Sequence, residues 1–185
     1  LGSVIHFLSF RGKRALVSFI QTMYSIPTVF VGMLVFLVVS RRGPAGSMGL
    51  LFTPWAIIIG EVLLIAPIIT GLTISALGGT GGGIADTARA LGASRGRTAL
   101  LVLSEARYAV LTGVLMGFGR AVSEIGVAIM VGGNIAGYTR TLTTAISLGI
   151  GRGETAGSIA LGLILLLVAM AVSVTVNSMQ HRRKR

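Results

Sequence analysis

Four stretches of the chain are apolar over more than twenty residues each: residues 15–40, 52–77, 108–133 and 155–179. A helix rising 1.5 Å per residue needs about twenty apolar residues to cross a hydrocarbon core of about 30 Å. Hydrophobic residues make up 53% of the chain and charged residues only 11%, whereas a soluble domain carries about a quarter of charged residues. These features predict an all-α polytopic membrane protein, and they argue against a soluble enzyme, a nucleic-acid-binding protein or a disordered chain.

The basic residues are distributed unevenly between the ends of these spans. Eleven of the sixteen fall on one side and four on the other, with Arg120 inside a span. The eleven are Arg11, Lys13, Arg14, Arg89, Arg95, Arg97, Arg107, Arg182, Arg183, Lys184 and Arg185, and the four are Arg41, Arg42, Arg140 and Arg152. Because Lys and Arg near span ends resist translocation, we expect the richer side and the C-terminus to be cytoplasmic. The cluster at residues 181–185 is expected to contact anionic lipid.

The remaining features point to one transmembrane domain over residues 1–185. Residues 1–10 are apolar but too short to cross the bilayer, so we interpret them as the end of an upstream helix in an N-terminally truncated chain. Pro27 and Pro67 lie within the first two spans, where each is expected to kink a helix.

Residues 78–107 form the longest segment expected on the cytoplasmic side. It begins with a glycine-rich run, residues 78–83, which predicts a flexible loop. Residues 84–91 then have the pattern of a short amphipathic helix, with Asp86 in its first turn and Gly92 as its stop. Such a helix either lies on lipid headgroups or docks a partner protein. The glycine run is not a phosphate loop, because the only lysines are Lys13 and Lys184, so no ATPase motif is present.

The third span contains Arg120 and Glu124, four residues apart and therefore on one helical face. Charges are expensive at membrane depth, so we expect the two to compensate each other and to face protein or a water-filled path. A structural ion pair and a path lining are equally compatible with the spacing. Glu61 is a third charge within a span, and the sequence names no partner for it.

The sequence from Asp86 to Ser94, DTARALGAS, resembles the cytoplasmic Glu-Ala-Ala loop of permease subunits of ABC importers. The resemblance implies a type I importer helical bundle in which this loop forms a coupling helix that fits a cleft on the ATPase subunit. The residues it assigns to coupling are Asp86, Thr87, Ala88, Arg89, Gly92 and Ala93. The chain departs from the family pattern at Asp86 and Thr87, and Ser104-Glu105 stands where the family usually has Leu-Pro.

Three further segments resemble permeases for tungstate and molybdate: residues 119–135, residues 139–146 and residues 41–54. The resemblance implies a homodimer in a bacterial or archaeal cytoplasmic membrane, served by an ABC ATPase that uses ATP and by an external oxyanion-binding protein. It implies no cofactor or metal bound by this subunit and no catalysis by it. For a doubly charged oxyanion, the attractive groups would be Arg120, the hydroxyls of three threonines and the backbone amides near Gly132. The path residues expected on this basis are Arg120, Glu124, Gly132, Gly133, Asn134, Thr141, Thr143 and Thr144, with Glu124 neutralising Arg120 at rest.

Other functions remain compatible with the sequence. The permease could carry another small solute, or the chain could be an ion-coupled secondary transporter with Glu61 and Glu124 as proton sites. A membrane scaffold or a channel without energy coupling is a third possibility. Internal repeats would favour secondary transport, but the two halves of the chain show no convincing similarity.

Overall fold

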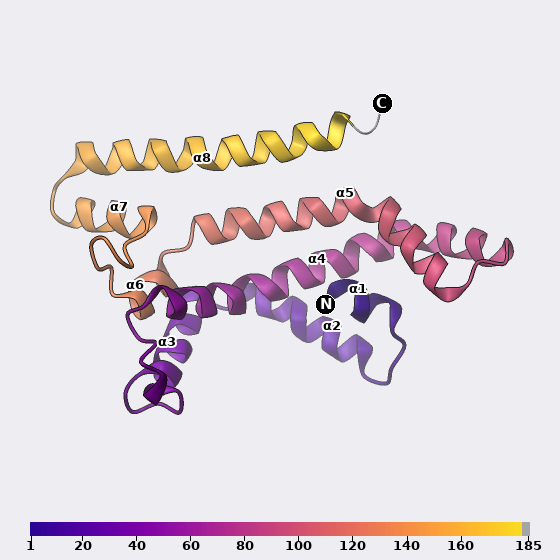
Figure 1. Ribbon diagram of the computed structural model, residues 1–185, viewed down its shortest axis with the longest axis horizontal. Helices are drawn as coiled ribbons and strands as arrows, with labels where there is room; N and C mark the ends of the chain where they lie inside the picture. The colour runs from indigo at the N-terminus through magenta and orange to yellow at the C-terminus, as the bar shows by residue number, and fades with distance from the viewer. Residues whose placement is uncertain (183–185) are drawn as a thin grey trace. The chain divides into compact units, whose positions relative to one another are not determined.

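The computed structural model describes residues 1–182, and of residues 80, 81 and 179–182 it describes only the backbone. The described residues form helices and turns (Figure 1). The helices are α1 (Gly2–Phe7), α2 (Lys13–Thr22), α3 (Thr28–Val39), α4 (Pro54–Ala90), α5 (Arg95–Val122), α6 (Gly126–Gly132), α7 (Leu142–Gly151) and α8 (Thr155–Arg182), with 3-10 turns η1 (Met23–Ser25) and η2 (Gly46–Met48). The chain divides into two compact units, residues 1–25 with 66–118, and residues 26–65 with those from 119 onward.

Three of the helical segments are long and apolar enough to cross a membrane: Pro54–Gly79, Arg95–Val122 and Thr155–Ser178. They overlap the second, third and fourth predicted spans and confirm the all-α membrane fold. The third begins at Arg95, within the segment predicted as a cytoplasmic loop, and ends at Val122, so its predicted bounds of 108–133 were wrong. The helix α8 spans the predicted fourth segment, and most of its apolar side chains are exposed, as expected for a helix that meets lipid or other subunits. The side chains of the predicted C-terminal lipid anchor, residues 181–185, lie outside the described part of the chain.

The first predicted span, residues 15–40, is two helices rather than one. α2 and α3 are separated by η1 and meet with a bend of 102°. Pro27 explains the break, because a proline lacks an N–H and disfavours helical geometry at the residue before it. Its carbonyl instead starts α3 by accepting the N–H groups of Phe30 at 3.0 Å and Val31 at 3.2 Å. By contrast, α4 continues through Pro67.

The first unit packs the C-terminal half of α4 against the N-terminal part of α5. Leu77, Val102 and Ala106 are buried together at this interface. Gly113 allows close approach, because a Cβ at this position would lie 3.0 Å from the Cβ of Leu72. Gly113 therefore permits close helix contact in this region.

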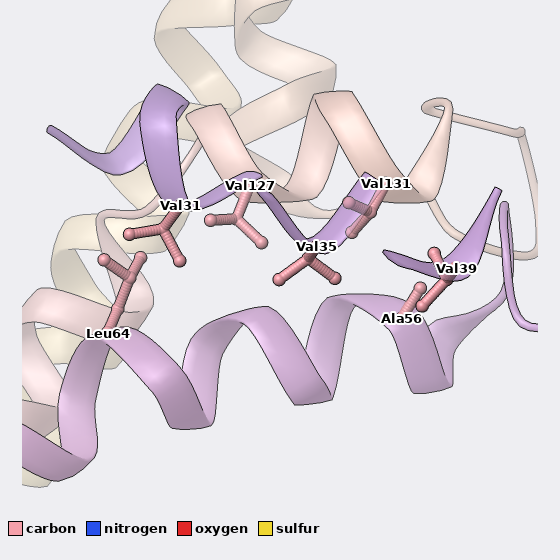
Figure 2. Close-up of a cluster of buried hydrophobic side chains, with 7 residues drawn as sticks. All are labelled: Val31, Val35, Val39, Ala56, Leu64, Val127 and Val131. Carbon is pink, nitrogen blue, oxygen red and sulfur yellow. The ribbon is translucent and has the colours of Figure 1, made fainter. Parts of the chain in front are cut away.

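The second unit has its own apolar core, formed by α3, the start of α4 and α6 (Figure 2). Val31, Val35 and Val39 repeat every four residues and so present one face of α3 to the other two helices. The other buried members are Ala56, Leu64, Val127 and Val131. Gly60 lies directly against α6, since a Cβ there would be 2.3 Å from Val127 Cγ1.

The third predicted span, residues 108–133, is also interrupted. α5 ends at Val122, and α6 begins at Gly126. At the end of α5 the Ser123 hydroxyl donates to the Arg120 carbonyl at 3.1 Å, and the Glu124 N–H bonds the Ala121 carbonyl at 3.1 Å. Both bonds reach the carbonyl three residues earlier in the chain. They occupy carbonyls that the next turn of an α-helix would use, so the helix ends here.

Candidate coupling turn and translocation path

The helix α4 ends in a hydrogen-bonded turn built from the predicted coupling residues. Gly92 adopts φ 79°, a left-handed conformation that glycine accepts without a Cβ clash. The Ala93 N–H donates to the Ala88 carbonyl and the Gly92 N–H to the Arg89 carbonyl, both at 2.9 Å. This is a Schellman motif, and it satisfies carbonyls that the helix end would leave free. The predicted helix stop at Gly92 is confirmed.

Two residues later, Ser94 starts the next helix. Its hydroxyl accepts the Arg97 N–H at 3.4 Å, and its carbonyl accepts the Thr98 N–H at 2.9 Å. Serine is favoured at this position because its side chain satisfies a first-turn amide. The sequence from Ala88 to Ser94 therefore contains the signals that end α4 and begin α5. Residues 91–94 join these two long helices.

The segment before this turn differs from the prediction. The glycine run is helical, so residues 84–90 are the last turns of α4 and not a separate short helix. Each glycine weakens a helix by about 1 kcal/mol relative to alanine, but extending an existing helix avoids the cost of nucleating a new one. Asp86 consequently lies near the C-terminal end of its helix, where the helix dipole does not favour it. The prediction that Asp86 occupies a first turn was wrong.

The coupling residues present a mostly polar exposed surface. Asp86, Thr87 and Arg89 are exposed, whereas Ala88 is buried. Arg89 Nη1 lies 3.5 Å from Asp86 Oδ1, with both side chains more than two-thirds exposed. Leu91, the last residue of the predicted amphipathic helix, is 82% exposed at the turn. The turn thus offers a charged pair beside one uncovered leucine.

In the second unit, the two predicted span charges form an ion pair. Arg120 Nη2 lies 3.1 Å from Glu124 Oε2, which confirms the expected compensation. The other Glu124 oxygen, Oε1, accepts the Val127 N–H at 3.1 Å and so caps the first turn of α6. The Glu124 side chain is 2% exposed and that of Arg120 is 36% exposed.

Glu61 is the third charge in this region. Its Oε2 is buried without a hydrogen-bond partner in the described part of the chain. Glu124 and Arg120 are the charged groups that act on it electrostatically. The structure therefore brings all three span charges into one neighbourhood, which the sequence did not reveal.

Gly132, Gly133 and Asn134 end α6 and begin a compact loop. Gly133 adopts φ 71° and Asn134 φ 50°, two successive left-handed residues. Arg140 clamps the loop, because its Nε donates to Asn134 Oδ1 at 3.1 Å and its Nη2 to the Asn134 carbonyl at 3.2 Å. Asn134 Nδ2 donates to the Thr144 carbonyl at 3.3 Å and ties the loop to α7.

The three threonines at the start of α7 form one hydrogen-bonded group. Thr141 and Thr144 make a reciprocal capping box, in which each side chain accepts the backbone N–H of the other. Thr143 Oγ1 donates to the Glu124 carbonyl at 2.8 Å and contacts Thr141 Oγ1 at 2.9 Å. Thr144 is fully buried. All three hydroxyls therefore make hydrogen bonds within the fold. Their role in a solute path stays a prediction.

Sequence reasoning missed one residue of this loop, Thr139. It is 3% exposed, donates to the Gly132 carbonyl at 2.6 Å and accepts the Ile135 N–H at 3.0 Å. The Thr139 hydroxyl thus hydrogen-bonds both the end of α6 and the loop that follows it. The only signal in the sequence was its place beside Arg140, within a segment already quoted for its resemblance.

The fold and these sites define a polytopic helical membrane protein with paired charges in its apolar segments. The chain belongs to the family of binding-protein-dependent transport system inner membrane components, whose family model matches residues 1–185. It is therefore a transport subunit of the ABC permease class, located in an inner membrane with several helical spans.

Curated relatives agree with this assignment. The chain is 42% identical over 149 residues to a probable anion ABC transporter permease protein of Haloferax volcanii, covering 78% of this chain and 64% of the relative. It is 39% identical over 148 residues to the tungstate uptake system permease protein TupB of Peptoclostridium acidaminophilum, covering 80% and 65%. A putative molybdenum transport system permease of Bacillus subtilis is 28% identical over 146 residues, covering 75% and 64%. The chain thus spans less than two-thirds of the length of these relatives.

Proposed function

We propose that the chain is the membrane-spanning subunit of an ATP-driven importer that moves tungstate into the cytoplasm. The observation that carries this proposal is the turn at residues 88–94, whose stop and start motifs join two long helices next to the exposed Asp86–Arg89 pair at the end of α4. An ATPase subunit that closes on ATP would move this turn as a unit, because the backbone hydrogen bonds fix it to both α4 and α5. The subunit itself would contribute no catalysis and bind no cofactor.

The assembly we propose is a homodimer in a bacterial or archaeal cytoplasmic membrane, with the C-terminus cytoplasmic. Asp86, Thr87, Arg89, Gly92 and Ala93 would contact the ATPase directly, and Ala88 would hold the turn against α5. An external binding protein would deliver the oxyanion to the opposite side. Support for the orientation comes from the excess of Lys and Arg at one set of span ends.

The path would pass the Arg120–Glu124 pair and the loop formed by Gly132, Gly133 and Asn134. Arg120 is one-third exposed and is held by a single carboxylate, so a doubly charged oxyanion could attract it. The hydroxyls of Thr141 and Thr143 are half-buried in the hydrogen-bonded group that includes the Glu124 carbonyl, and they would donate to the oxyanion only by exchanging those bonds. Thr144 is buried and would support them through the capping box.

Tungstate is favoured over molybdate because the relatives named for tungstate uptake are 39% identical, whereas those named for molybdenum transport are 28% or 29% identical. Molybdate, or another small solute, is the second candidate. The difference between tungstate and molybdate would depend largely on the external binding protein, which receives the solute first.

The test is uptake of tungstate into proteoliposomes that contain the permease, its ATPase and its binding protein. We expect uptake only with ATP, and competition by molybdate that is weaker than competition by unlabelled tungstate. Asp86→Lys should reduce uptake at least tenfold, because the reversed charge repels Arg89 and would disrupt the docked turn. Glu105→Lys is the matched control, as Glu105 is exposed in the same helical unit but lies outside the turn. Uptake driven by a proton gradient without ATP would instead establish secondary transport.

A further inference from the structure

Glu61 is a charged residue of the second unit to which the proposed function gives no role. It lies on α4 between Gly60 and Leu64, and both of these neighbours belong to the contact with α6. A Cβ at Gly60 would lie 2.3 Å from Val127 Cγ1, and Leu64 is buried in the same apolar cluster as Val127. Because the Val127 N–H donates to Glu124 Oε1 at 3.1 Å, the packing of α4 on α6 places Glu61 beside the helix that Glu124 caps.

One oxygen of the Glu61 carboxyl group lacks a partner. Oε2 is buried and accepts no hydrogen bond from the described part of the chain. Buried polar atoms in proteins are nearly always hydrogen-bonded, because an unpaired one keeps the full cost of its desolvation. The charged groups that act on Glu61 are Arg120, which attracts it, and Glu124, which repels it. Arg120 is therefore the charged donor that could satisfy this oxygen.

The Arg120 guanidinium has donors to spare. It carries five N–H groups, and its only ion pair within the described residues is the one with Glu124. Its side chain is 36% exposed, so it is not fixed on all sides by packing. A change of side-chain rotamer can thus carry the guanidinium to a second carboxylate without emptying a core position.

Glu124 does not depend on Arg120 alone. Its Oε1 accepts the Val127 N–H, and this bond at the start of α6 does not involve the guanidinium. Glu61 Oε2 has no comparable donor among the described residues. If Arg120 moved from Glu124 to Glu61, each carboxylate would still have one donor. The two arrangements therefore differ in which carboxylate holds the cation and not in whether a carboxylate is left unpaired.

We propose that Glu61 is a positioning residue that takes the Arg120 guanidinium when Glu124 releases it. Arg120 would then tie the end of α5 to α4, and no ion pair would hold the break between α5 and α6. A charge at membrane depth is costly without a partner, and this exchange avoids that cost. Its consequence for transport rests on the proposed function: the break between α5 and α6 could bend in each cycle while Arg120 keeps a counter-charge.

The experiment measures melting temperatures of the purified complete permease in detergent, in four forms: wild type, Glu61→Gln, Glu124→Gln and the double variant. Glutamine keeps the shape of glutamate, and its amide oxygen can still accept the Val127 N–H. In the wild type, Glu61→Gln should leave the melting temperature unchanged or raise it, because it removes a carboxylate without a partner. In the Glu124→Gln background, where Arg120 would turn to Glu61, the same change should lower it by about 3 °C, the effect of one partly exposed ion pair.

Glu154→Gln is the matched control. Glu154 is an exposed carboxylate of the same unit and has no ion pair within the described residues. Its replacement should shift the melting temperature equally with and without Glu124→Gln. Glu61→Asp keeps the negative charge and should therefore restore part of the stability that Glu61→Gln loses in the Glu124→Gln background.

An equal effect of Glu61→Gln in both backgrounds would overturn the proposal, since Glu61 would then not replace Glu124 as the partner of Arg120. Non-additivity of the same size with Glu154→Gln would also overturn it, because the effect would be one of net charge. In proteoliposomes with the ATPase and the binding protein, Glu61→Gln should lower the maximal rate of ATP-dependent tungstate uptake about fivefold and leave the KM unchanged. A raised KM with an unchanged maximal rate would contradict a positioning role.

The two readouts separate this inference from the proposed function. If the wild type took up no tungstate while Glu61 and Glu124 were coupled in the melting temperatures, the proposed function would fail and the exchange of Arg120 would stand. If the wild type took up tungstate and the two residues showed no coupling, the exchange would fail and the proposed function would stand.

Discussion

Glu124 lies 3.1 Å from Arg120 through Oε2 and caps α6 through Oε1, so one carboxylate joins the end of α5 to the start of α6. The two residues are four apart in sequence, yet only Arg120 is helical in α5. The ion pair therefore spans the break between α5 and α6 and does not lie along one face of a single helix.

Arg120→Leu should destabilise the protein more than the paired change does. Removing the guanidinium leaves the 2%-exposed Glu124 side chain without its counter-charge, which costs about 3–5 kcal/mol for a fully buried pair and less here because Arg120 is one-third exposed. We expect a loss of about 2 kcal/mol, measured by thermal unfolding in detergent. The double variant Arg120→Leu, Glu124→Gln should recover part of it. If the double variant is less stable by the sum of both single effects, the two residues are not coupled.

Gly92→Ala should weaken the turn, because a Cβ is strained at φ 79°. We expect a loss of about 1 kcal/mol in thermal unfolding and a fall in ATP-dependent uptake. Gly83→Ala is the matched control in the same helix, where a Cβ would meet nothing within 4 Å and alanine favours the helix by about 1 kcal/mol. A melting temperature that rises in both variants would show that Gly92 is not required to be left-handed.

Gly60→Ala should destabilise the second unit through overpacking. The new methyl would lie 2.3 Å from Val127 Cγ1, so α4 and α6 must separate or Val127 must leave its rotamer. Such overpacking costs about 1–3 kcal/mol. Val127→Ala in the same chain should restore much of the loss, as measured by a double-mutant cycle of melting temperatures. Failure of that second change to rescue Gly60→Ala would mean that the two helices do not meet there.

Two variants at the start of α7, Thr143→Val and Thr144→Val, distinguish a role in stability from a role in the solute path. Thr144 is buried and its hydroxyl accepts the Thr141 N–H at 2.9 Å, so its loss should cost about 1–3 kcal/mol of stability. Thr143 donates to the Glu124 carbonyl and is half-buried, so its loss should raise the KM for tungstate with a smaller effect on stability. Melting temperature and uptake kinetics on both variants distinguish these outcomes. A stability loss in Thr143→Val equal to that in Thr144→Val, with unchanged KM, would assign Thr143 to the fold alone.

Features that depend only on residues close together in the chain could be predicted from the sequence. Gly92 stops a helix because its own backbone accepts the left-handed conformation. The four-residue spacing also led to the expectation that Arg120 and Glu124 would pair, although Glu124 lies beyond the end of α5 and not on its face. The break after Val122 was not predicted, because residues 108–133 are apolar on both sides of Arg120, Ser123 and Glu124 and apolarity does not report helix ends. The helical state of the glycine run was also missed, since propensity argues for a loop while the adjoining helix extends through it.

The sequence by itself determined that this is a helical membrane protein, where its apolar segments lie and which residues end α4, because span length and helix stops depend on local composition and backbone geometry. Tertiary structure alone decided that Glu61 lies near Arg120 and Glu124, that Glu124 caps α6 and that Thr139 closes the loop after it. Those contacts depend on how helices distant in sequence pack, and a buried carboxylate or hydroxyl takes its partner from whatever donors that packing brings within about 3 Å.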